Sequence, residues 1–383
     1  MKIAYITHYS RLYGANKSLL TLIIKLRQTG EVSPLVICRK EGDFTEKLRE
    51  YDIPYKIIPF KLWIKNKKDK VSIAKVKIKQ LWNFLFACNV SLVLKKEKID
   101  LIHTNSLATN FGGEISKLTN IKHIWHFREF LEEDYNLDFE ISNEKAFKFI
   151  SRYSNQIVCI SKDIEKKFKP FLSTSNMKLI YNGIEIEGFH NQIPGENSLI
   201  EKNKFNLVIV GNISEEKGQL QAVKAIKYLV EEINLKEIKL NLIGDGEGKE
   251  LIEEYVRKNK LEKFVEFWGY RNDIHEILRF MDAGLMCSKR EAFGRTTVEY
   301  MASETPVIGA RSGATKEIIE DKVNGLLYNP KDYKDLAEKI NLLYKNNNDL
   351  INKLKGNALS TVKNNYTSDK NAENILTMYK EIL

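Results

Sequence analysis

The sequence predicts an α/β protein built from two doubly wound domains. Its length of 383 residues is more than one ordinary core accommodates and suggests about two domains. Short apolar runs alternate with longer helical patterns, which is typical of parallel sheets covered by helices. This alternation stops over residues 185–204, where Pro194-Gly195 and many Asn and Glu residues indicate a linker.

Each half of the chain carries its own series of strand patterns. Before the linker, apolar runs predict strands at residues 3–7, 35–38, 55–58, 101–104, 123–126, 157–160 and 178–181. After it, they predict strands at residues 205–210, 240–243, 265–267, 285–287, 306–308 and 325–328. Helical patterns include an apolar stripe over residues 15–27 and a stretch over residues 370–383. The expected domains are therefore residues 1–185 and 186–365.

Composition points to a cytoplasmic globular protein. Hydrophobic residues make up 43% of the chain, but no apolar run approaches the ~18 residues of a membrane span. Residues 2–7 form a strand pattern and lack the features of a signal peptide. The cysteines Cys38, Cys88, Cys159 and Cys287 are scattered in apolar runs. That pattern predicts buried thiols in a reducing compartment, and neither disulfides nor a zinc site.

One segment is strongly basic. The chain has a net charge of +10, and residues 61–79 contain eight lysines and a single acid, Asp69. Apolar residues interleave with them, including Trp63 and, further on, Trp82. Two interpretations stay open: peripheral contact with an anionic membrane on the inner face of the plasma membrane, or a helix with a solvated lysine face and an apolar side in the core. No nucleic-acid motif is present, so no nucleic-acid partner is expected.

Two glutamates eight residues apart, Glu291 and Glu299, form the most informative motif. The first follows a strand pattern, and the second lies one to two turns into the next helical pattern. A carboxylate after a parallel strand lies at the carboxyl edge of the sheet, where open α/β sheets bind ligands. Carboxylate oxygens accept strong hydrogen bonds from sugar hydroxyls. The start of the helix near Gly294 offers free N–H groups to an anion.

Two glycine-bearing turns accompany this motif. The turn from Gly211 to Gly218 joins a strand to a helix and carries Lys217 near the start of the helix, which suits phosphate binding. The alternative is an ordinary turn with an exposed lysine. Gly244 and Gly246 follow the next strand and allow close approach of the backbone to a ligand, or simply a tight turn.

In the first half, polar side chains follow the ends of predicted strands. They are His8, Asn105, His126, Arg128 and Glu129. A histidine at the carboxyl end of a strand can hydrogen-bond a hydroxyl or shift a proton. The alternative for His126 is a structural histidine that caps a turn.

The run from Glu291 to Glu299, with its flanks, resembles the signature of glycosyltransferase family 4, retaining nucleotide-sugar glycosyltransferases with the GT-B fold. The resemblance is dense over residues 205–330 and sparser over residues 1–185. It implies two Rossmann-like domains facing a cleft, an acceptor-side N-terminal domain and a C-terminal domain that binds the nucleotide-sugar donor. It also implies that the last helix, within residues 366–383, packs back on the first domain.

The resemblance implies roles for single residues. Glu291 and His126 would meet the transferred sugar, Lys217 the donor diphosphate, and Glu299 the ribose hydroxyls. Further donor-binding positions are Gly14, Gly211, Asn212, Gly244, Tyr270, Phe293, Gly294 and Arg295. Acceptor contacts would come from His8, Asn105, Arg128 and Glu129.

Two positions depart from the family pattern. Asn212 stands where the family usually carries an arginine that meets the diphosphate, and Arg295 is a candidate replacement for that charge. Tyr13 stands where the family usually has a glycine before Gly14.

The activity implied by the resemblance is transfer of a sugar from a nucleoside-diphosphate sugar, most simply a UDP-sugar. The acceptor would be a glycan or lipid-linked glycan in the synthesis of a bacterial capsule or lipopolysaccharide. No metal or other cofactor is expected. The alternatives are a nucleotide-sugar epimerase or hydrolase of the same fold, and a non-catalytic subunit that binds membrane or polysaccharide.

Overall fold

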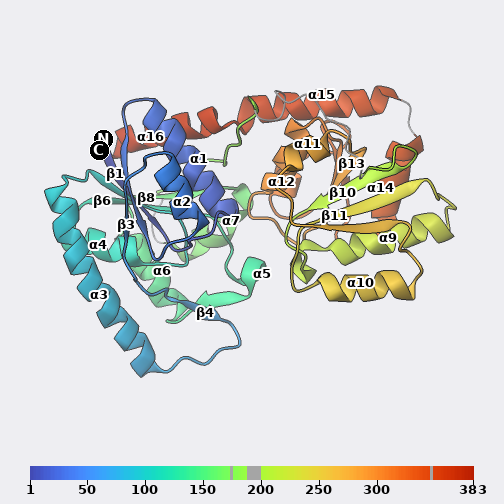
Figure 1. The fold of residues 1–383 in the computed structure, drawn as a ribbon. Helices are drawn as coiled ribbons and strands as arrows, with labels where there is room; N and C mark the ends of the chain where they lie inside the picture. The colour runs from blue at the N-terminus through green and yellow to red at the C-terminus, as the bar shows by residue number, and fades with distance from the viewer. Residues whose placement is uncertain (173–175, 188–199, 346–347) are drawn as a thin grey trace. The chain divides into compact units, whose positions relative to one another are not determined.

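The computed structural model describes residues 1–172, 176–187, 200–345 and 348–383. Its N-terminal unit consists of Met1–Gly183 with Ser368–Leu383, and its C-terminal unit consists of Ile184–Thr367. Each unit has a parallel sheet with helices on both sides (Figure 1). The predicted fold class, an α/β chain with two doubly wound parallel sheets, is confirmed. Much of the predicted linker lies outside the described residues.

The sheet of the N-terminal unit has seven parallel strands. In spatial order they are β3 (Tyr55–Ile57), β2 (Ser33–Cys38), β1 (Lys2–Thr7), β5 (Leu101–Thr104), β6 (Lys122–Phe127), β8 (Gln156–Cys159) and β9 (Met177–Leu179). Alternate residues of β1 point to opposite faces, so Ile3 and Tyr5 join one core and Ala4 and Ile6 join the other. Every predicted strand of this half is present, with ends that differ by a few residues.

Helices cover both faces of this sheet. They are α1 (Gly14–Gln28), α2 (Asp43–Glu50), α3 (Ile73–Lys96), α4 (Phe111–Thr119), α5 (Glu132–Tyr135), α6 (Asn143–Arg152), α7 (Lys162–Phe168) and α16 (Ser368–Ile382), with a short 3-10 helix over Lys169–Phe171. Helices α1, α2 and α16 share the core that holds Ile3 and Tyr5. Helices α3 and α4 share the core on the opposite face.

The last helix of the chain, α16, packs on the first. Ile375 and Met378 are buried in the same core as Leu19 and Ile23 of α1. An ion pair of 3.0 Å joins Lys25 to Asp369. The two ends of the sequence therefore meet within the N-terminal unit.

The sheet of the C-terminal unit has six parallel strands. In spatial order they are β12 (Val265–Gly269), β11 (Ile238–Ile243), β10 (Phe205–Val210), β13 (Ala283–Met286), β14 (Val307–Ala310) and β15 (Leu326–Tyr328). The helices are a 3-10 turn at Glu215–Lys217, then α9 (Gln219–Glu231), α10 (Lys249–Lys258), α11 (Ile274–Leu278), α12 (Arg295–Ala302), α13 (Thr315–Ile318), α14 (Tyr333–Lys345) and α15 (Asn348–Asn365). One core of this unit lies under α9, α10, α14 and α15. Val298, Tyr300 and Met301 of α12 are buried as well and lie outside that cluster.

Each sheet reverses its strand order at one point. In the N-terminal unit the reversal lies between β1 and β5, and in the C-terminal unit it lies between β10 and β13. The loops at a reversal diverge, which leaves a crevice beyond the carboxyl ends of the two strands. The C-terminal reversal is flanked by the loops that carry Lys217 and Glu291.

The basic segment at residues 61–79 is not one continuous helix. Strand β4 (Ile64–Asn66) pairs antiparallel with β7 (Leu137–Phe139), and α3 begins only at Ile73. In the membrane interpretation of this segment Trp63 would lie at the bilayer surface, and the structure does not place it there. Trp63 is buried, stacks on Trp125 and donates its Nε1 hydrogen to the Leu107 carbonyl at 2.6 Å.

Within the described parts of the chain, no helix has both the length and the apolarity needed to cross a bilayer. The four cysteines are free, and Cys38, Cys159 and Cys287 are buried. Burial raises the pKa of the Cys38 and Cys287 thiols to about 12, so these two thiols stay protonated at neutral pH.

Candidate active site

The loops after β10 and β13 are joined at the strand reversal of the C-terminal unit. Gly218, with φ of +71°, ends the 3-10 turn, and a Cβ there would lie 2.2 Å from the Cys287 carbonyl oxygen. Only glycine therefore allows this loop to lie against the end of β13. The Lys289 amide donates to the Glu216 carbonyl at 2.9 Å. This close contact brings Lys217 beside Glu291.

Lys217 and Glu291 form an ion pair. Lys217 Nζ lies 2.6 Å from Glu291 Oε1, with side chains 39% and 12% exposed, respectively. The ammonium group is therefore open to water, whereas the carboxylate is nearly buried.

The backbone of Glu291 is fixed from the next loop. The Ala314 amide donates to the Glu291 carbonyl at 2.9 Å, and a Cβ on Gly313 would lie 2.5 Å from the Glu291 nitrogen. Gly313 has a φ of +50°, which also favours glycine. The backbone of Glu291 is thus held by contacts that do not depend on Lys217, whereas its carboxylate is held by the ion pair with Lys217.

Helix α12 starts immediately after the same loop. Gly294, with φ of +86°, is its N-cap, and the first amides of a helix have no partner within the helix. Glu299 lies one turn in, and its Oε1 accepts from Arg295 Nε at 2.8 Å. The predicted phosphate-facing helix start and both predicted carboxylates therefore belong to one loop–helix segment.

Thr297 belongs to this segment and was not predicted from the sequence. Its side chain is fully buried in the first turn of α12, and its Oγ1 has no hydrogen-bond partner among the described residues. The Oγ1 atom of Thr297 lies 3.4 Å from the position that a Cβ on Gly294 would occupy. A hydroxyl in the first turn of a helix that follows a glycine was the only signal, and it is a weak one.

Backbone hydrogen bonds connect the loops after β10, β11 and β12. Gly211 N donates to Ile243 O at 2.9 Å, and Gly244 N donates to Gly269 O at 2.8 Å. Gly244 has a φ of +139°, and a Cβ there would lie 2.0 Å from the Gly211 carbonyl oxygen. The close contact between these loops is therefore enough to require glycine at position 244. The predicted role of Gly244 in donor binding stays a prediction.

Three further residues were predicted to bind the donor: Tyr270, Phe293 and Asn212. Tyr270 follows β12 and is 72% exposed, whereas the side chain of Phe293 is buried against Tyr366. Only the backbone of Phe293 is therefore placed to contact a ligand. Asn212 accepts at its backbone carbonyl from Gln219 Nε2 at 2.8 Å, which ties this loop to the start of α9.

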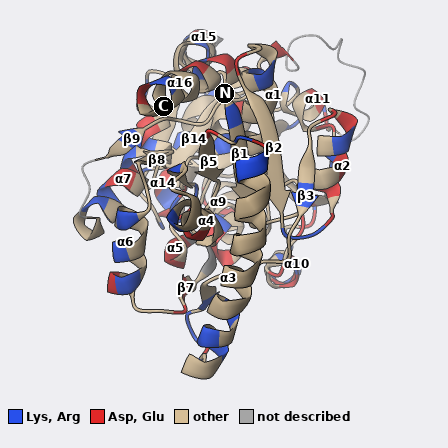
Figure 2. Ribbon diagram, turned by 90° about the vertical axis from the view of Figure 1, so that its left-hand side faces the viewer, with Lys and Arg blue, Asp and Glu red and all other residues tan. Residues whose placement is uncertain are grey.

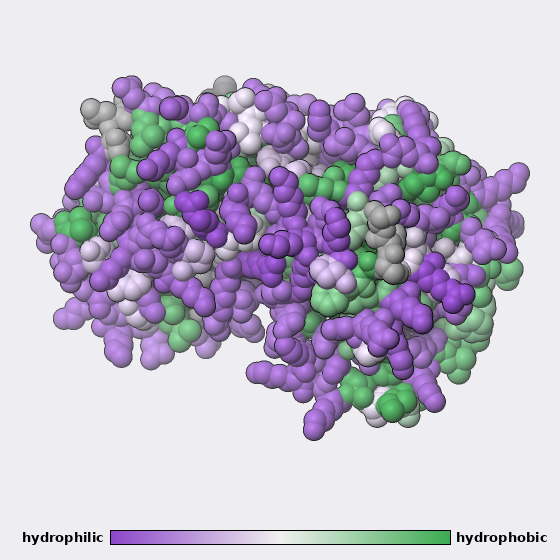
Figure 3. All heavy atoms as spheres, turned by 180° about the vertical axis from the view of Figure 1, so that it is seen from behind, coloured by the Kyte–Doolittle hydropathy of each residue, from purple (hydrophilic) through white to green (hydrophobic). Residues whose placement is uncertain are grey.

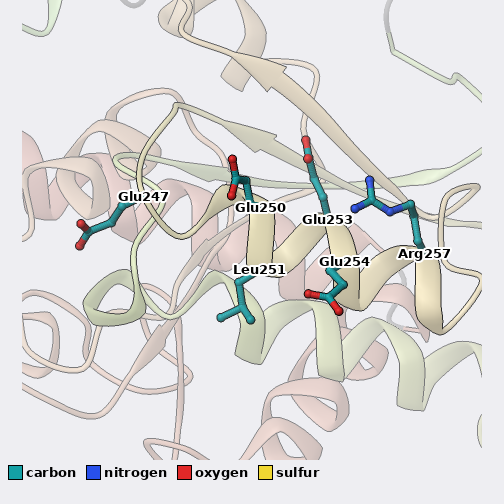
Figure 4. Close-up of a pocket in the computed structure, with 6 residues that line it drawn as sticks. All are labelled: Glu247, Glu250, Leu251, Glu253, Glu254 and Arg257. Atoms are coloured by element: carbon teal, nitrogen blue, oxygen red, sulfur yellow. The ribbon is translucent and has the colours of Figure 1, made fainter.

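A shallow hollow of about 490 Å³ lies along α10 and reaches Glu247 in the loop after β11 (Figure 4). Its lining is acidic and consists of Glu247, Glu250, Leu251, Glu253, Glu254 and Arg257. Four carboxylates beside one guanidinium repel an anionic ligand such as a diphosphate. This hollow does not compete with the loop site for the predicted donor.

In the N-terminal unit, a buried chain of hydrogen bonds ends at His126. Its Nδ1 lies 3.0 Å from His103 Nε2, and His103 Nδ1 lies 2.5 Å from the hydroxyl of Tyr379 on α16. Tyr379 in turn donates to Tyr5 at 3.3 Å. The other nitrogen, His126 Nε2, is buried without a partner among the residues described.

The protonation of this chain follows from burial. Burial, and secondarily Arg128, holds the pKa of both His103 and His126 well below the ordinary value of 6.5, so both rings are neutral at neutral pH. In the arrangement in which the Tyr379 hydroxyl donates to Tyr5, its oxygen accepts from His103 Nδ1–H. His103 Nε2 then accepts from His126 Nδ1–H. This arrangement leaves His126 Nε2 as a hydrogen-bond acceptor.

The predicted acceptor residues are largely engaged within the protein. Arg128 donates to Asn105 Oδ1 at 2.8 Å and also to Asn182. Glu129 is buried and accepts from Ser106 and from the Leu107 amide. These contacts hold the loop after β5 in place, and an acceptor role for Asn105, Arg128 and Glu129 stays a prediction.

His8 and Gly14 flank the loop after β1. Burial and nearby Arg39 lower the pKa of His8 to about 4, so this ring is neutral at neutral pH. A Cβ on Gly14 would meet no atom within 4 Å, so the surrounding protein does not require glycine at this position. Its predicted role beside the donor is neither supported nor opposed by local packing.

A metal site is not evident. Within residues 1–172, 176–187, 200–345 and 348–383, no group of three or more His, Cys, Asp or Glu side chains is arranged to hold a metal ion. Lys217 and Arg295 are the cations that pair with the two predicted carboxylates, Glu291 and Glu299.

Known proteins match both units of the chain. Residues 13–187 match the model described as Glycosyltransferase Family 4, and residues 195–361 match the model described as Glycosyl transferases group 1. An uncharacterized glycosyltransferase of Methanocaldococcus jannaschii is 29% identical over 76% of this chain and 78% of its own length. The UDP-Gal:α-D-GlcNAc-diphosphoundecaprenol α-1,3-galactosyltransferase of Escherichia coli is 24% identical over 91% of this chain and 89% of its own length.

Solved structures share the fold of the whole chain. Anabaena HepE in complex with UDP superposes with a TM-score of 0.83 at 21% identity, covering 100% of both chains. The sucrose-phosphate synthase of Thermosynechococcus elongatus superposes with a TM-score of 0.77 at 16% identity, covering 100% of this chain and 98% of its own. With a family model matched in each unit and the two-sheet fold in common, the chain belongs to the group 1, family 4 glycosyltransferases and is an enzyme that transfers sugars.

Proposed function

We propose that the protein is a retaining glycosyltransferase that moves a sugar from a UDP-sugar to a glycan or lipid-linked glycan during synthesis of a bacterial envelope polysaccharide. The observation that carries the donor site is the Lys217–Glu291 pair at the strand reversal, beside the start of α12 and Glu299. UDP as the nucleotide is supported by the relatives, since Anabaena HepE binds UDP and UDP-glucose. The lipid-linked acceptor is supported by the name of the Escherichia coli relative.

The chemistry of the proposed reaction needs positive charge at the donor diphosphate. As the anomeric C–O bond breaks, negative charge grows on the leaving nucleoside diphosphate. Lys217, Arg295 and the free amides at the start of α12 would stabilise this charge without rearranging in the transition state. The two glutamates hold the two cations in the ligand-free protein, so donor binding would exchange each ion pair for contacts with the diphosphate.

The remaining roles concern hydroxyl groups. Glu299 would accept from the ribose hydroxyls, and Glu291, once its cation turns to the diphosphate, would accept from a hydroxyl of the transferred sugar. His126 Nε2 would accept from another sugar hydroxyl, since its lone pair has no partner in the described protein. His8, Asn105, Arg128 and Glu129 remain proposed acceptor contacts.

The proposed function predicts metal-independent transfer. Purified protein should transfer a sugar from at least one UDP-sugar to a polyprenyl-diphosphate-linked or soluble glycan, and should keep this activity after exhaustive EDTA treatment. The reason is that Lys217 and the start of α12 supply the charge that a divalent cation supplies in other transferases. Mass spectrometry of the product, with NMR of its anomeric proton, would report transfer and retention.

Two outcomes of that assay would contradict the proposal. Activity lost with EDTA and restored by Mg²⁺ or Mn²⁺ would place the charge compensation on a metal. Turnover of the UDP-sugar that does not require an acceptor would favour the epimerase or hydrolase alternative. GDP- and ADP-sugars in the same panel would test the choice of UDP.

The hydrogen-bonded chain behind His126 gives a separate prediction. In Tyr379→Phe, the His103 Nδ1–H loses its acceptor, and the free energy of unfolding should fall by about 1–3 kcal/mol. The His126 tautomer should also shift, because the fixed direction of the chain is lost, and kcat should fall by roughly tenfold. Imidazole nitrogen NMR shifts would report the tautomer.

Tyr5→Phe is the matched control for this prediction. It removes the 3.3 Å contact that directs the Tyr379 hydroxyl but leaves the 2.5 Å contact between Tyr379 and His103, so the free energy of unfolding and kcat should fall less than in Tyr379→Phe. If Tyr379→Phe leaves both the imidazole nitrogen shifts and kcat unchanged, Tyr379 is only a packing residue.

A further inference from the structure

Helix α3 has an apolar face on the side that points away from its own core. Its inner face is buried and consists of Val76, Asn83, Ala87, Val90, Ser91 and Leu94. On the other side, Ile78 is 67% exposed, Leu81 60%, Leu85 59% and Leu92 71%. We call these four residues the outer stripe. At about 3.6 residues per turn they fall within about 60° of arc, centred opposite the buried face.

The outer stripe is long and flanked by further apolar side chains. From Ile78 to Leu92 it extends about 21 Å along the helix axis. Ile73 at the start of the helix is 75% exposed, and Trp82 and Phe84 are 41% and 43% exposed at its sides. In the space-filling view, apolar atoms gather at the lower right edge, where α3 lies (Figure 3). Single exposed leucines need no explanation, but a contiguous row of this length marks an interaction surface.

The charged residues of α3 itself are all positive. Helix α3 contains Lys75, Lys77, Lys79, Lys95 and Lys96 and no acidic residue. Figure 2 shows the helix as a largely tan ribbon with blue near its ends. Lys68 and Lys70, in the loop before the helix, are also exposed. Of the helix lysines, Lys79 is paired with Glu140, and the other four are exposed.

We propose that the outer stripe of α3 binds the surface of an anionic lipid bilayer. An apolar helix face edged with lysines matches the boundary between acyl chains and anionic headgroups. A second copy of the chain fits this face poorly, because a symmetric pair would bring Lys75 and Lys77 of one α3 helix toward Lys95 and Lys96 of the other, and residues 73–96 contain no acidic side chain. The surface differs from the one expected from residues 61–79, since Trp63 faces inward and the apolar contact comes from the later turns of α3.

The inner face of α3 connects this surface to the rest of the unit. Ala87, Val90 and Leu94 share a core with Ile6 and Ile102 of the central strands β1 and β5. A bilayer bound to the outer stripe would therefore hold the whole N-terminal unit at the membrane, because α3 is part of the core of that unit. The inference deepens the proposed function. It depends on that proposal only in one respect, the lipid-linked acceptor.

Liposome flotation tests the proposal without any substrate. The protein should float with vesicles that contain phosphatidylglycerol and should not float with pure phosphatidylcholine. Binding should weaken between low and high salt, because charges near a bilayer are screened within about 8–10 Å at physiological ionic strength. Changing both Lys75 and Lys77 to Gln should lower the partition coefficient by roughly fivefold for each lysine.

A second variant tests the contribution of the apolar side chains. The triple change Leu81→Gln, Leu85→Gln and Leu92→Gln should lower the partition coefficient by at least about tenfold. These side chains are exposed, so the fold should be unaffected, and circular dichroism would verify this. A control with the same number of apolar-to-Gln changes at scattered exposed positions, Phe171, Ile233 and Leu251, should float as the wild type does.

The outcomes separate this inference from the proposed function. If the wild type ignores anionic vesicles at low salt, or if the triple variant floats unchanged, the inference is overturned, whatever the activity on a soluble acceptor. If sedimentation shows a wild-type dimer that the triple variant converts to monomer without any vesicle binding, the face is a self-association surface and the inference is also overturned. Salt-sensitive flotation that is lost in the triple variant and kept in its control supports it, even if the proposed sugar transfer fails.

Discussion

Replacing Lys217 with Ala is expected to lower kcat by about 100-fold or more, with a smaller effect on KM. The proposed partner of this ammonium group is the donor diphosphate, whose negative charge grows as the anomeric bond breaks. An interaction that is stronger in the transition state than in the ground state appears in kcat. Removing a single such charge from a preorganised site typically costs a factor of about 10²–10³. Initial rates over a range of donor concentration would measure both constants.

Lys289→Ala is the matched control for this change. Its side chain is 39% exposed, as is that of Lys217, and it pairs with Glu215 and Glu216 at 2.7 and 3.3 Å on the adjoining loop. It has no proposed role in catalysis, so kcat should stay within about twofold of the wild type. A Lys217→Ala variant in which KM alone changes would show uniform binding and refute the proposed role.

A low kcat of Lys217→Ala has a second possible cause, because Lys217 pairs with Glu291. Loss of the lysine could displace the glutamate from its position. The backbone contacts of Glu291 with Gly313 and Ala314 argue against a large displacement. The double change Lys217→Ala with Arg295→Ala would separate the two cases. If both cations act on one diphosphate, their effects should be non-additive, whereas a displaced Glu291 predicts independent effects.

The sequence predicts most of the parallel strands because parallel strands are buried on both faces and appear as uninterrupted apolar runs. The same rule explains what it missed. Strands β4 and β7 are three residues each, and β4 reads Ile-Lys-Asn, which has no apolar run. The sequence left the place of Trp63 open because this residue sits among lysines, while its neighbours in the structure, Trp125, Phe139 and Phe149, come from more than sixty residues away.

The candidate site was predictable where its chemistry is local. Glu291, Gly294 and Glu299 lie within nine consecutive residues, so their arrangement follows from one loop and one helix. The contact of Lys217 with Glu291 required the strand order, which places β10 beside β13 although 74 residues separate the two side chains. The chain from Tyr379 to His126 could not be predicted, since it depends on α16 returning to the first core.

Replacing Glu299 with Ala is expected to weaken UDP binding by about 1.5–3 kcal/mol, or roughly 10- to 150-fold in Kd. The proposed ribose hydroxyls would lose a charged acceptor that lies one turn inside α12, 15% exposed and held by Arg295 at 2.8 Å. Isothermal calorimetry with UDP would measure the loss. Glu231→Ala is a suitable control, because Glu231 forms an i,i+4 pair with Lys227 on α9 and has no proposed ligand.

Comparison of nucleotides would show which part of the donor Glu299 contacts. If the carboxylate binds the ribose, Glu299→Ala should weaken UDP and UMP by the same factor, and its effect should vanish with 2′,3′-dideoxy-UDP. Arg295→Ala should instead weaken UDP more than UMP, because its proposed partner is the diphosphate. Should Glu299→Ala fold normally and bind UDP as tightly as the wild type, the ribose assignment is wrong, and the Arg295–Glu299 pair serves only to stabilise the first turns of α12.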